Sequence, residues 1–158
     1  MLTIRFARPE DTGLILAFIR ELADYEHMAD AVVATEPLLR ETLFERRGAE
    51  VLIAEEDGVP AGFALFFHNY STFLGRAGLY LEDLFVRPAY RGKGYGKALL
   101  RQLAQIALER GCGRMEWACL DWNTPSIDFY KALGAEAMDD WTTYRLSGPS
   151  LQAMAKEE

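Results

Sequence analysis

The chain has 158 residues, half of them hydrophobic, and a formal net charge of −7 at neutral pH. This length and composition allow a buried core without disulfides or a structural metal, so we expect one globular domain over residues 1–158. The negative net charge argues against a nucleic-acid partner, because binding of phosphates requires a basic surface. The negative charge either attracts cationic partners or only keeps the protein soluble.

The N-terminal part predicts a strand followed by two helices. Residues 2–7 alternate between apolar and polar side chains, as in a strand, and residues 9–11 supply the start of a helix that ends near Tyr25. Apolar side chains at helical spacing predict its core-facing stripe: Ile15, Phe18, Ile19 and Leu22. Residues 35–37 open a shorter second helix that carries four apolar side chains.

The middle of the chain predicts an antiparallel hairpin and a further strand. Residues 51–54 and 61–67 read as two strands, and the pair Asp57-Gly58 between them is typical of a tight hairpin turn. Residues 79–86 form the next strand, which Arg87-Pro88 ends.

The last third predicts helices and strands in alternation. We expect a helix over residues 94–110, a strand over 115–120, a short helix over 125–133, a last strand over 141–146 and a polar tail helix. No repeat or linker is present. The order of elements therefore indicates a mixed α/β sheet with helices on both faces.

Neither a membrane span nor a metal site is expected. No stretch approaches the ~20 apolar residues of a spanning helix, and the N-terminus lacks a basic and then apolar leader. Two cysteines, Cys112 and Cys119, are too few for a disulfide framework. Together with the two histidines, His27 and His68, they do not show the spacing of metal ligands. We therefore expect a cytoplasmic protein that binds no metal and no membrane.

A glycine-rich turn, residues 91–96, connects the strand that ends at residue 86 to the following helix. Glycines let backbone N–H groups approach an anion, the helix N-terminus adds partial positive charge, and Lys97 adds a full charge. The turn predicts a phosphate or pyrophosphate site, although a purely structural role is the alternative. It is not a P-loop, because Arg91 stands where that motif needs glycine and Ala98 follows Lys97. It is not a dinucleotide fingerprint either, because the third glycine comes one residue early.

The same turn resembles the Arg/Gln-x-x-Gly-x-Gly/Ala motif of the GNAT acetyltransferases, and the preceding strand ends Glu82-Asp83-Leu84-Phe85-Val86 as in that family. Residues 121–131 resemble the family's second cofactor segment. The resemblance implies a mixed, mostly antiparallel twisted sheet flanked by helices, and acetyl-CoA as cofactor. The cofactor-binding residues that it implies are Leu84, Phe85, Val86, Arg91, Gly92, Lys93, Gly94, Tyr95, Gly96, Lys97, Asn123, Ser126, Tyr130 and Lys131.

Within the family, the chain looks most like the spermidine/spermine and thialysine acetyltransferases. The resemblance spans nearly the whole sequence, in residues 21–26, 79–83, 122–123 and 154–158. Residues 73–75 depart from the tryptophan and Ile-Gly turn of the polyamine enzymes, and the acidic run before Trp141 is shorter. A small diamine or an amino-acid-like amine such as thialysine is therefore at least as plausible a substrate as a long polyamine.

Acetyl transfer to an amine requires a base, because a primary ammonium with a pKa near ~10.4 is almost fully charged at neutral pH. Glu82 matches the base of the resembled branch. Alternation along the strand points Glu82 and Asp83 to opposite faces unless a bulge intervenes, so we expect them to have different roles, and Asp83 can be structural.

A proton donor and an oxyanion donor complete the chemistry that the resemblance implies. Tyr130 matches the donor to the departing thiolate, with packing of its ring against the cofactor as the alternative. A backbone N–H between Leu84 and Val86 would bind the oxyanion.

A cationic amine needs carboxylates along a groove and aromatic walls. The candidate substrate-binding residues are Tyr25, Glu26, Glu82, Asp83, Trp122, Asp139, Asp140 and Trp141. Each of these residues alone is more often a solvated surface charge or a core ring.

Three functions are compatible with these residues. The first is N-acetylation of a small-molecule amine by direct transfer in a ternary complex, since no Ser or Cys nucleophile with a placed His is evident. The second is protein or peptide N-acetylation, and the third is a non-catalytic acyl-CoA-binding module, against which Glu82 and Tyr130 speak. By analogy with the resembled branch, whose sites borrow residues from a partner, we expect a homodimer.

Overall fold

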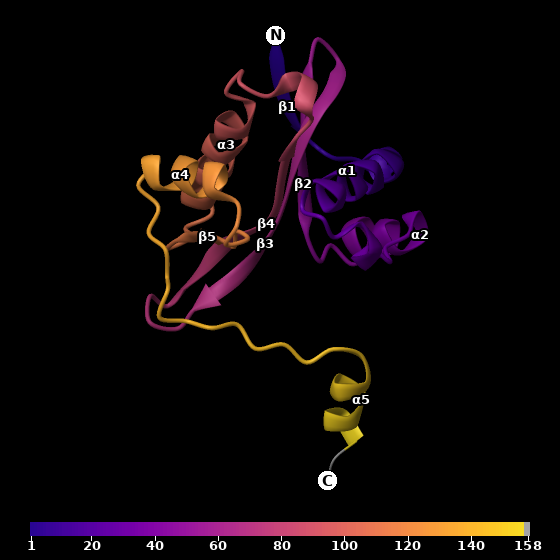
Figure 1. Cartoon of the computed structure of the whole chain (residues 1–158), viewed down its shortest axis with the longest axis vertical. Helices are drawn as coiled ribbons and strands as arrows, with labels where there is room; N and C mark the ends of the chain where they lie inside the picture. The colour runs from indigo at the N-terminus through magenta and orange to yellow at the C-terminus, as the bar shows by residue number, and fades with distance from the viewer. Residues whose placement is uncertain (157–158) are drawn as a thin grey trace. The chain divides into compact units, whose positions relative to one another are not determined.

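A five-stranded sheet organises residues 1–120 of the computed structural model, which describes residues 1–156 (Figure 1). The strands lie in sequence order: β1 Leu2–Phe6, β2 Glu50–Glu56, β3 Val59–Ser71, β4 Arg76–Val86 and β5 Met115–Trp117. Neighbours from β1 to β4 are antiparallel, whereas β5 is parallel to β4. The predicted mixed, mostly antiparallel sheet is therefore confirmed. β3 and β4 are longer than predicted, and β5 is shorter.

Helix α1 (Thr12–Tyr25) follows a 3-10 turn and covers one face of the sheet together with α2 (Glu36–Leu39) (Figure 1). Asp11 fixes the start of α1, because its carboxylate accepts two hydrogen bonds from Arg5 at 2.7 and 2.9 Å and one from the Arg8 amide at 2.7 Å. Beyond Leu39 the chain continues as a π-helix, Arg40–Glu45, in place of the regular helix that the sequence predicted.

Helix α3 (Tyr95–Glu109) covers the opposite face of the sheet (Figure 1). Its buried side chains are Leu99, Leu100, Leu103, Ile106 and Ala107, which recur at helical spacing. Leu52 and Ile53 are neighbours on β2 and point to opposite faces, yet both are buried, at 1% and 0% exposure. The sheet is therefore covered on both sides.

The chain from Asp121 onward forms a second unit with α4 (Thr124–Ala132) and α5 (Gly148–Lys156). Both helices were predicted, and the last two residues, Glu157 and Glu158, lie outside the described residues. The strand predicted over residues 141–146 is wrong, because that segment has no regular structure. A strand requires a hydrogen-bonded neighbour. No strand within residues 1–156 pairs with this segment, although its β-branched and aromatic residues suit one.

Candidate active site

β4 contains a bulge at Glu82. In the register between β3 and β4, Leu81 lies opposite Phe66 and Asp83 lies opposite Leu65, so Glu82 has no partner on β3. A bulge of this kind inserts one residue into a strand and interrupts the alternation of its side chains.

The bulge brings the carboxyl groups of Glu82 and Asp83 to the same face of the sheet. Leu65 packs against the apolar cluster under α1, so Asp83 opposite it lies on that face. Tyr80 lies opposite Phe67, two residues beyond Leu65, and Glu82 follows Tyr80 by two residues, which places both on that face as well. From the sequence, Glu82 and Asp83 could share a face only if a bulge interrupted the strand, and β4 contains that bulge.

Asp83 lies close enough to Glu82 and Glu26 for the charges of both carboxylates to act on it. Burial raises the pKa of Asp83 to about 6, and the charges of Glu82 and Glu26 add to the shift. Burial also raises the pKa of Glu26, which caps the C-terminus of α1. Within residues 1–156 no ion pair joins these three carboxylates to a cation. The group therefore has negative charge that a cationic ligand would compensate.

Two glycines of the glycine-rich turn have a left-handed backbone conformation. Gly92 and Gly94 both have φ of +80°, where a side chain would be strained, and Gly94 is the N-cap of α3. The turn therefore leads directly into the first amides of α3, which have no partner within the helix. Gly96 differs, because it is not one of the glycines with positive φ, and an added Cβ there would make only an ordinary contact with the Val86 Cγ2 atom at 3.9 Å.

Two side chains at the turn are held by another part of the protein. The Lys93 ammonium donates to Glu56 at 2.8 Å, and the Tyr95 hydroxyl donates to the same carboxylate. The Lys93 hydrogen bond lowers the pKa of Glu56. Glu56 thereby ties the turn to the end of β2, a role that no sequence pattern signals because the two segments lie far apart in the chain. Lys97 makes no ion pair within residues 1–156.

Arg91 connects the glycine-rich turn with a predicted substrate residue. Its Nε donates to the Val86 carbonyl at 2.9 Å, and its guanidinium lies 5.0 Å from the Tyr25 ring centroid and 5.5 Å from that of Phe85. Tyr25 precedes Glu26 at the end of α1. The predicted cofactor turn and the predicted amine-binding carboxylates are therefore neighbours within the first unit.

The edge of β4 beyond the bulge is open. β5 pairs with β4 only at Leu79, Tyr80 and Leu81, and no described strand pairs with that edge from Glu82 to Val86. Alternate N–H and C=O groups there can bind an extended chain that carries amides. The Phe85 side chain lies in the core, so only its backbone can contribute to such binding.

The other predicted site residues belong to the second unit and are described by themselves. Asn123 is buried and caps α4, since its Oδ1 accepts from the Ser126 amide at 3.4 Å. Tyr130 lies on α4 and is half-buried, with its ring 5.6 Å from that of Phe129. The exposed members of this set are Trp122, Lys131, Asp139, Asp140 and Trp141.

Among residues 1–156, no three His, Cys, Asp or Glu side chains are grouped so that they could hold a metal ion. No helix in the same residues is long and apolar enough to cross a membrane.

Comparisons with known proteins agree with this geometry. A model of the acetyltransferase (GNAT) family matches residues 16–135. The chain is 39% identical to a thialysine N-epsilon-acetyltransferase of Bos taurus, over 96% of each chain. It is 35% identical to an L-ornithine N5-acetyltransferase of Arabidopsis thaliana, over 97% of this chain and 87% of the relative. A solved structure, an integron cassette protein from the mobile metagenome of V. cholerae, has a TM-score of 0.83 at 30% identity and covers 99% of this chain and 98% of its own.

The sheet covered by helices on both faces, the glycine-rich turn before α3 and the family match define the class: the chain belongs to the GNAT family of acetyltransferases. It is an N-acetyltransferase, with named relatives that acetylate amines. The resemblance to the family and to its spermidine/spermine and thialysine branch is thereby confirmed. The roles of individual site residues stay predictions.

Proposed function

We propose that the protein transfers an acetyl group from acetyl-CoA to a primary amine of a small cationic substrate, of the thialysine, ornithine, diamine or polyamine type. The observation that carries this proposal is the group formed by Glu26, Glu82 and Asp83. The three carboxylates share one region and make no ion pair with a cation within residues 1–156. Burial raises the pKa of Asp83, and repulsion by Glu82 and Glu26 adds to the shift. A substrate ammonium would relieve that repulsion.

Acetyl-CoA supplies the acetyl group as a thioester, and two features of the first unit fit such a ligand. The positive-φ turn at Gly92 and Gly94 and the N-terminus of α3 would hold its pyrophosphate, with Lys97 as an available cation. The open edge of β4 would bind its amide-containing arm. Asn123, Ser126 and Lys131 are proposed as further contacts on the basis of the family resemblance.

We assign the proton transfers to two side chains. Glu82, which is exposed at the bulge, accepts the proton of the substrate ammonium directly or through water, while Asp83 and Glu26 attract and hold the cation. Tyr130 donates a proton to the departing thiolate. A backbone N–H between Leu84 and Val86 binds the developing oxyanion. Transfer is direct, in a ternary complex, and no covalent enzyme intermediate forms.

We also propose that residues 1–158 act as a single N-acetyltransferase domain, as a homodimer in the cytoplasm. Support for a second copy comes from the segment before α5, where the Trp141 and Tyr144 side chains are 78% and 92% exposed. Large exposed aromatic side chains are typical of surfaces that contact another protein. Sedimentation velocity measures the oligomeric state independently of activity.

The decisive experiment is thiol release from acetyl-CoA in the presence of a panel of amines. The panel contains putrescine, spermidine, spermine, thialysine, ornithine, lysine and a peptide with a free N-terminus. Norleucine is the matched control for the amino acids, because it keeps the α-amino group and lacks the side-chain amine. Turnover with a small cationic amine and none with norleucine supports the proposal. Activity on the peptide alone indicates a protein N-acetyltransferase, and no activity on any amine contradicts the proposal.

A further inference from the structure

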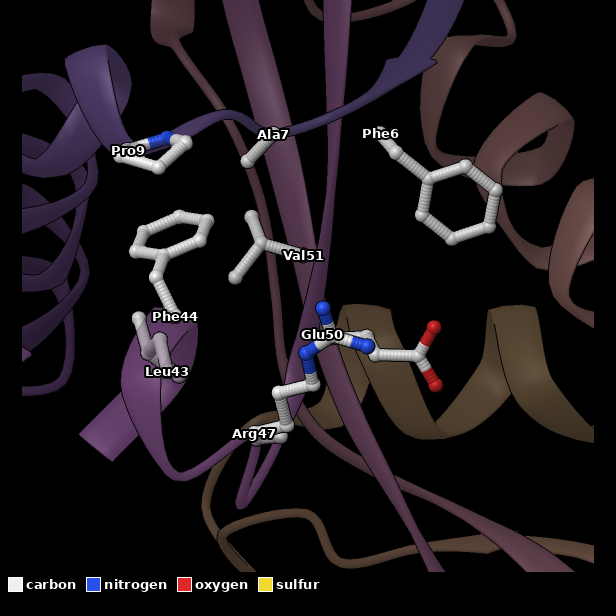
Figure 2. Close-up of a pocket in the computed structure, with 9 residues that line it drawn as sticks. Phe6, Ala7, Pro9, Leu43, Phe44, Arg47, Glu50 and Val51 are labelled. Atoms are coloured by element: carbon white, nitrogen blue, oxygen red, sulfur yellow. The ribbon is translucent and has the colours of Figure 1, made fainter. Parts of the chain in front are cut away.

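A cavity in the first unit is lined by residues that belong neither to the carboxylate group nor to the glycine-rich turn (Figure 2). It has a volume of about 520 Å³, within the range of ~300–1,000 Å³ that is typical of small-molecule sites. Its lining residues are Phe6, Ala7, Pro9, Leu43, Phe44, Arg47, Ala49, Glu50 and Val51. None of them is a predicted residue of the acetyl-transfer site.

The cavity wraps around the end of β1, where residues from both faces of the sheet reach it. Phe6 lies opposite Leu52 in the sheet, whereas Val51 belongs to the apolar cluster under α1. In Figure 2 the ring of Phe44 and the ring of Phe6 lie on either side of Val51. Phe6 is 46% exposed. The walls therefore offer apolar surface to a ligand.

Arg47 supplies an uncompensated charge to this cavity. Its side chain reaches into the cavity (Figure 2), and it makes no ion pair within residues 1–156. Its φ of +53° lies in the left-handed region, which is unfavourable for an arginine and turns the chain from the π-helix towards β2. The neighbouring Arg46, in contrast, pairs with Glu41 at 3.1 Å.

The one carboxylate that lines the cavity is already neutralised. Glu50 accepts two hydrogen bonds from Arg110, at 2.6 and 3.0 Å, and this pairing lowers its pKa. In Figure 2 the carboxylate of Glu50 points away from Arg47. A second guanidinium, that of Arg40, binds the Pro9 carbonyl at the cavity wall at 3.3 Å. Among the residues that line the cavity, Arg47 therefore carries the charge that no ion pair compensates.

We infer that this cavity is a binding site for a small amphipathic carboxylate, whose apolar body packs against the aromatic rings that line the cavity and whose carboxylate accepts hydrogen bonds from Arg47. A guanidinium matches a carboxylate in two parallel hydrogen bonds, which favours a planar anion over a point charge. This site is distinct from the proposed acetyl-transfer site, so its ligand is neither the amine nor acetyl-CoA.

The test uses the full chain saturated with coenzyme A, so that the glycine-rich turn does not bind the probe. The probe is 4-phenylbutyrate, and its uncharged amide is the matched control ligand. Calorimetry measures the Kd, and amide chemical shifts in NMR spectra locate the site. The expected result is binding of the carboxylate with shifts at Phe6, Phe44 and Arg47, and binding of the amide at least ~10-fold weaker.

Matched variants distinguish a specific carboxylate site from general attraction of anions to a basic surface. Arg47→Gln weakens 4-phenylbutyrate binding by ~10-fold or more, Arg47→Lys restores part of it, and Arg46→Gln leaves the Kd unchanged within about twofold. Thermal unfolding verifies that each variant is folded. Equal binding of carboxylate and amide, no binding of the carboxylate by the wild type, or equal effects of Arg46→Gln and Arg47→Gln would each overturn the inference.

Discussion

Glu82 and Asp83 are adjacent on β4, yet the bulge places their carboxyl groups on the same face of the sheet. In a regular strand, one of the two would face α3. Placing both beside Glu26 brings like charges together in a partly buried region, which costs free energy in the unliganded protein. That cost is recovered when a cation binds, so the arrangement favours cationic ligands at the expense of stability.

The first prediction concerns stability. The pKa of Asp83 is about 6 in the folded protein against an ordinary value of 3.8, so the folded state holds this proton more tightly than the unfolded state does. The contribution of Asp83 to the free energy of unfolding is therefore fully present below about pH 4. It is lost as the pH rises through about 6. Asp83→Asn removes the charge and should stabilise the protein at pH 7.5 by up to ~3 kcal/mol. Urea unfolding at pH 4.5 and 7.5 measures this, and a gain that does not grow with pH would contradict it. Asp30→Asn, at an exposed position, is the control.

The second prediction concerns the pH dependence of activity. If the ionised Asp83 attracts the substrate ammonium, kcat/KM for the amine should rise with pH through an inflection near 6, because only the carboxylate form binds the cation. The increase above neutral pH that comes from deprotonation of the amine should stay. In Asp83→Asn the lower inflection should disappear and the KM of the amine should rise ~10-fold, with the KM of acetyl-CoA little changed. Persistence of the inflection in the variant would assign it to another group.

Local features of the site could be predicted from the sequence, because they depend on neighbouring residues. The glycine-rich turn is an example, since Gly92 and Gly94 adopt the positive φ that glycine permits and α3 begins directly after them. The core faces of α1 and α3 follow in the same way from helical spacing.

Features that depend on pairing between distant segments could not be predicted. The bulge at Glu82 arises from the register with β3, which no pattern within β4 encodes. The contact between Glu56 and Lys93 joins residues 37 positions apart. The strand predicted over 141–146 was wrong for a related reason, because β-propensity alone does not form a strand without a neighbour.

The third prediction compares two glycines of the turn. Gly94→Ala forces alanine into a φ of +80°, which costs about 1–2 kcal/mol and should disturb the amides at the start of α3. We expect the KM of acetyl-CoA to rise ~10-fold, with a smaller change in the KM of the amine. Gly96→Ala is the matched control, because its added methyl group has only ordinary contact with Val86. Equal KM values of acetyl-CoA in the two variants would show that the backbone of the turn does not hold the cofactor.

The fourth prediction separates an enzyme from an acyl-CoA-binding module. Tyr130→Phe keeps the ring and its contact with Phe129 and removes only the hydroxyl. If this hydroxyl donates a proton to the thiolate, kcat should fall by ~100-fold, within the range of a lost general acid, while the Kd of coenzyme A in calorimetry stays within about twofold. Phe129→Leu is the control for packing on the same helix and should affect stability more than kcat. An unchanged kcat in Tyr130→Phe would mean that solvent or another group protonates the thiolate, and that Tyr130 only packs.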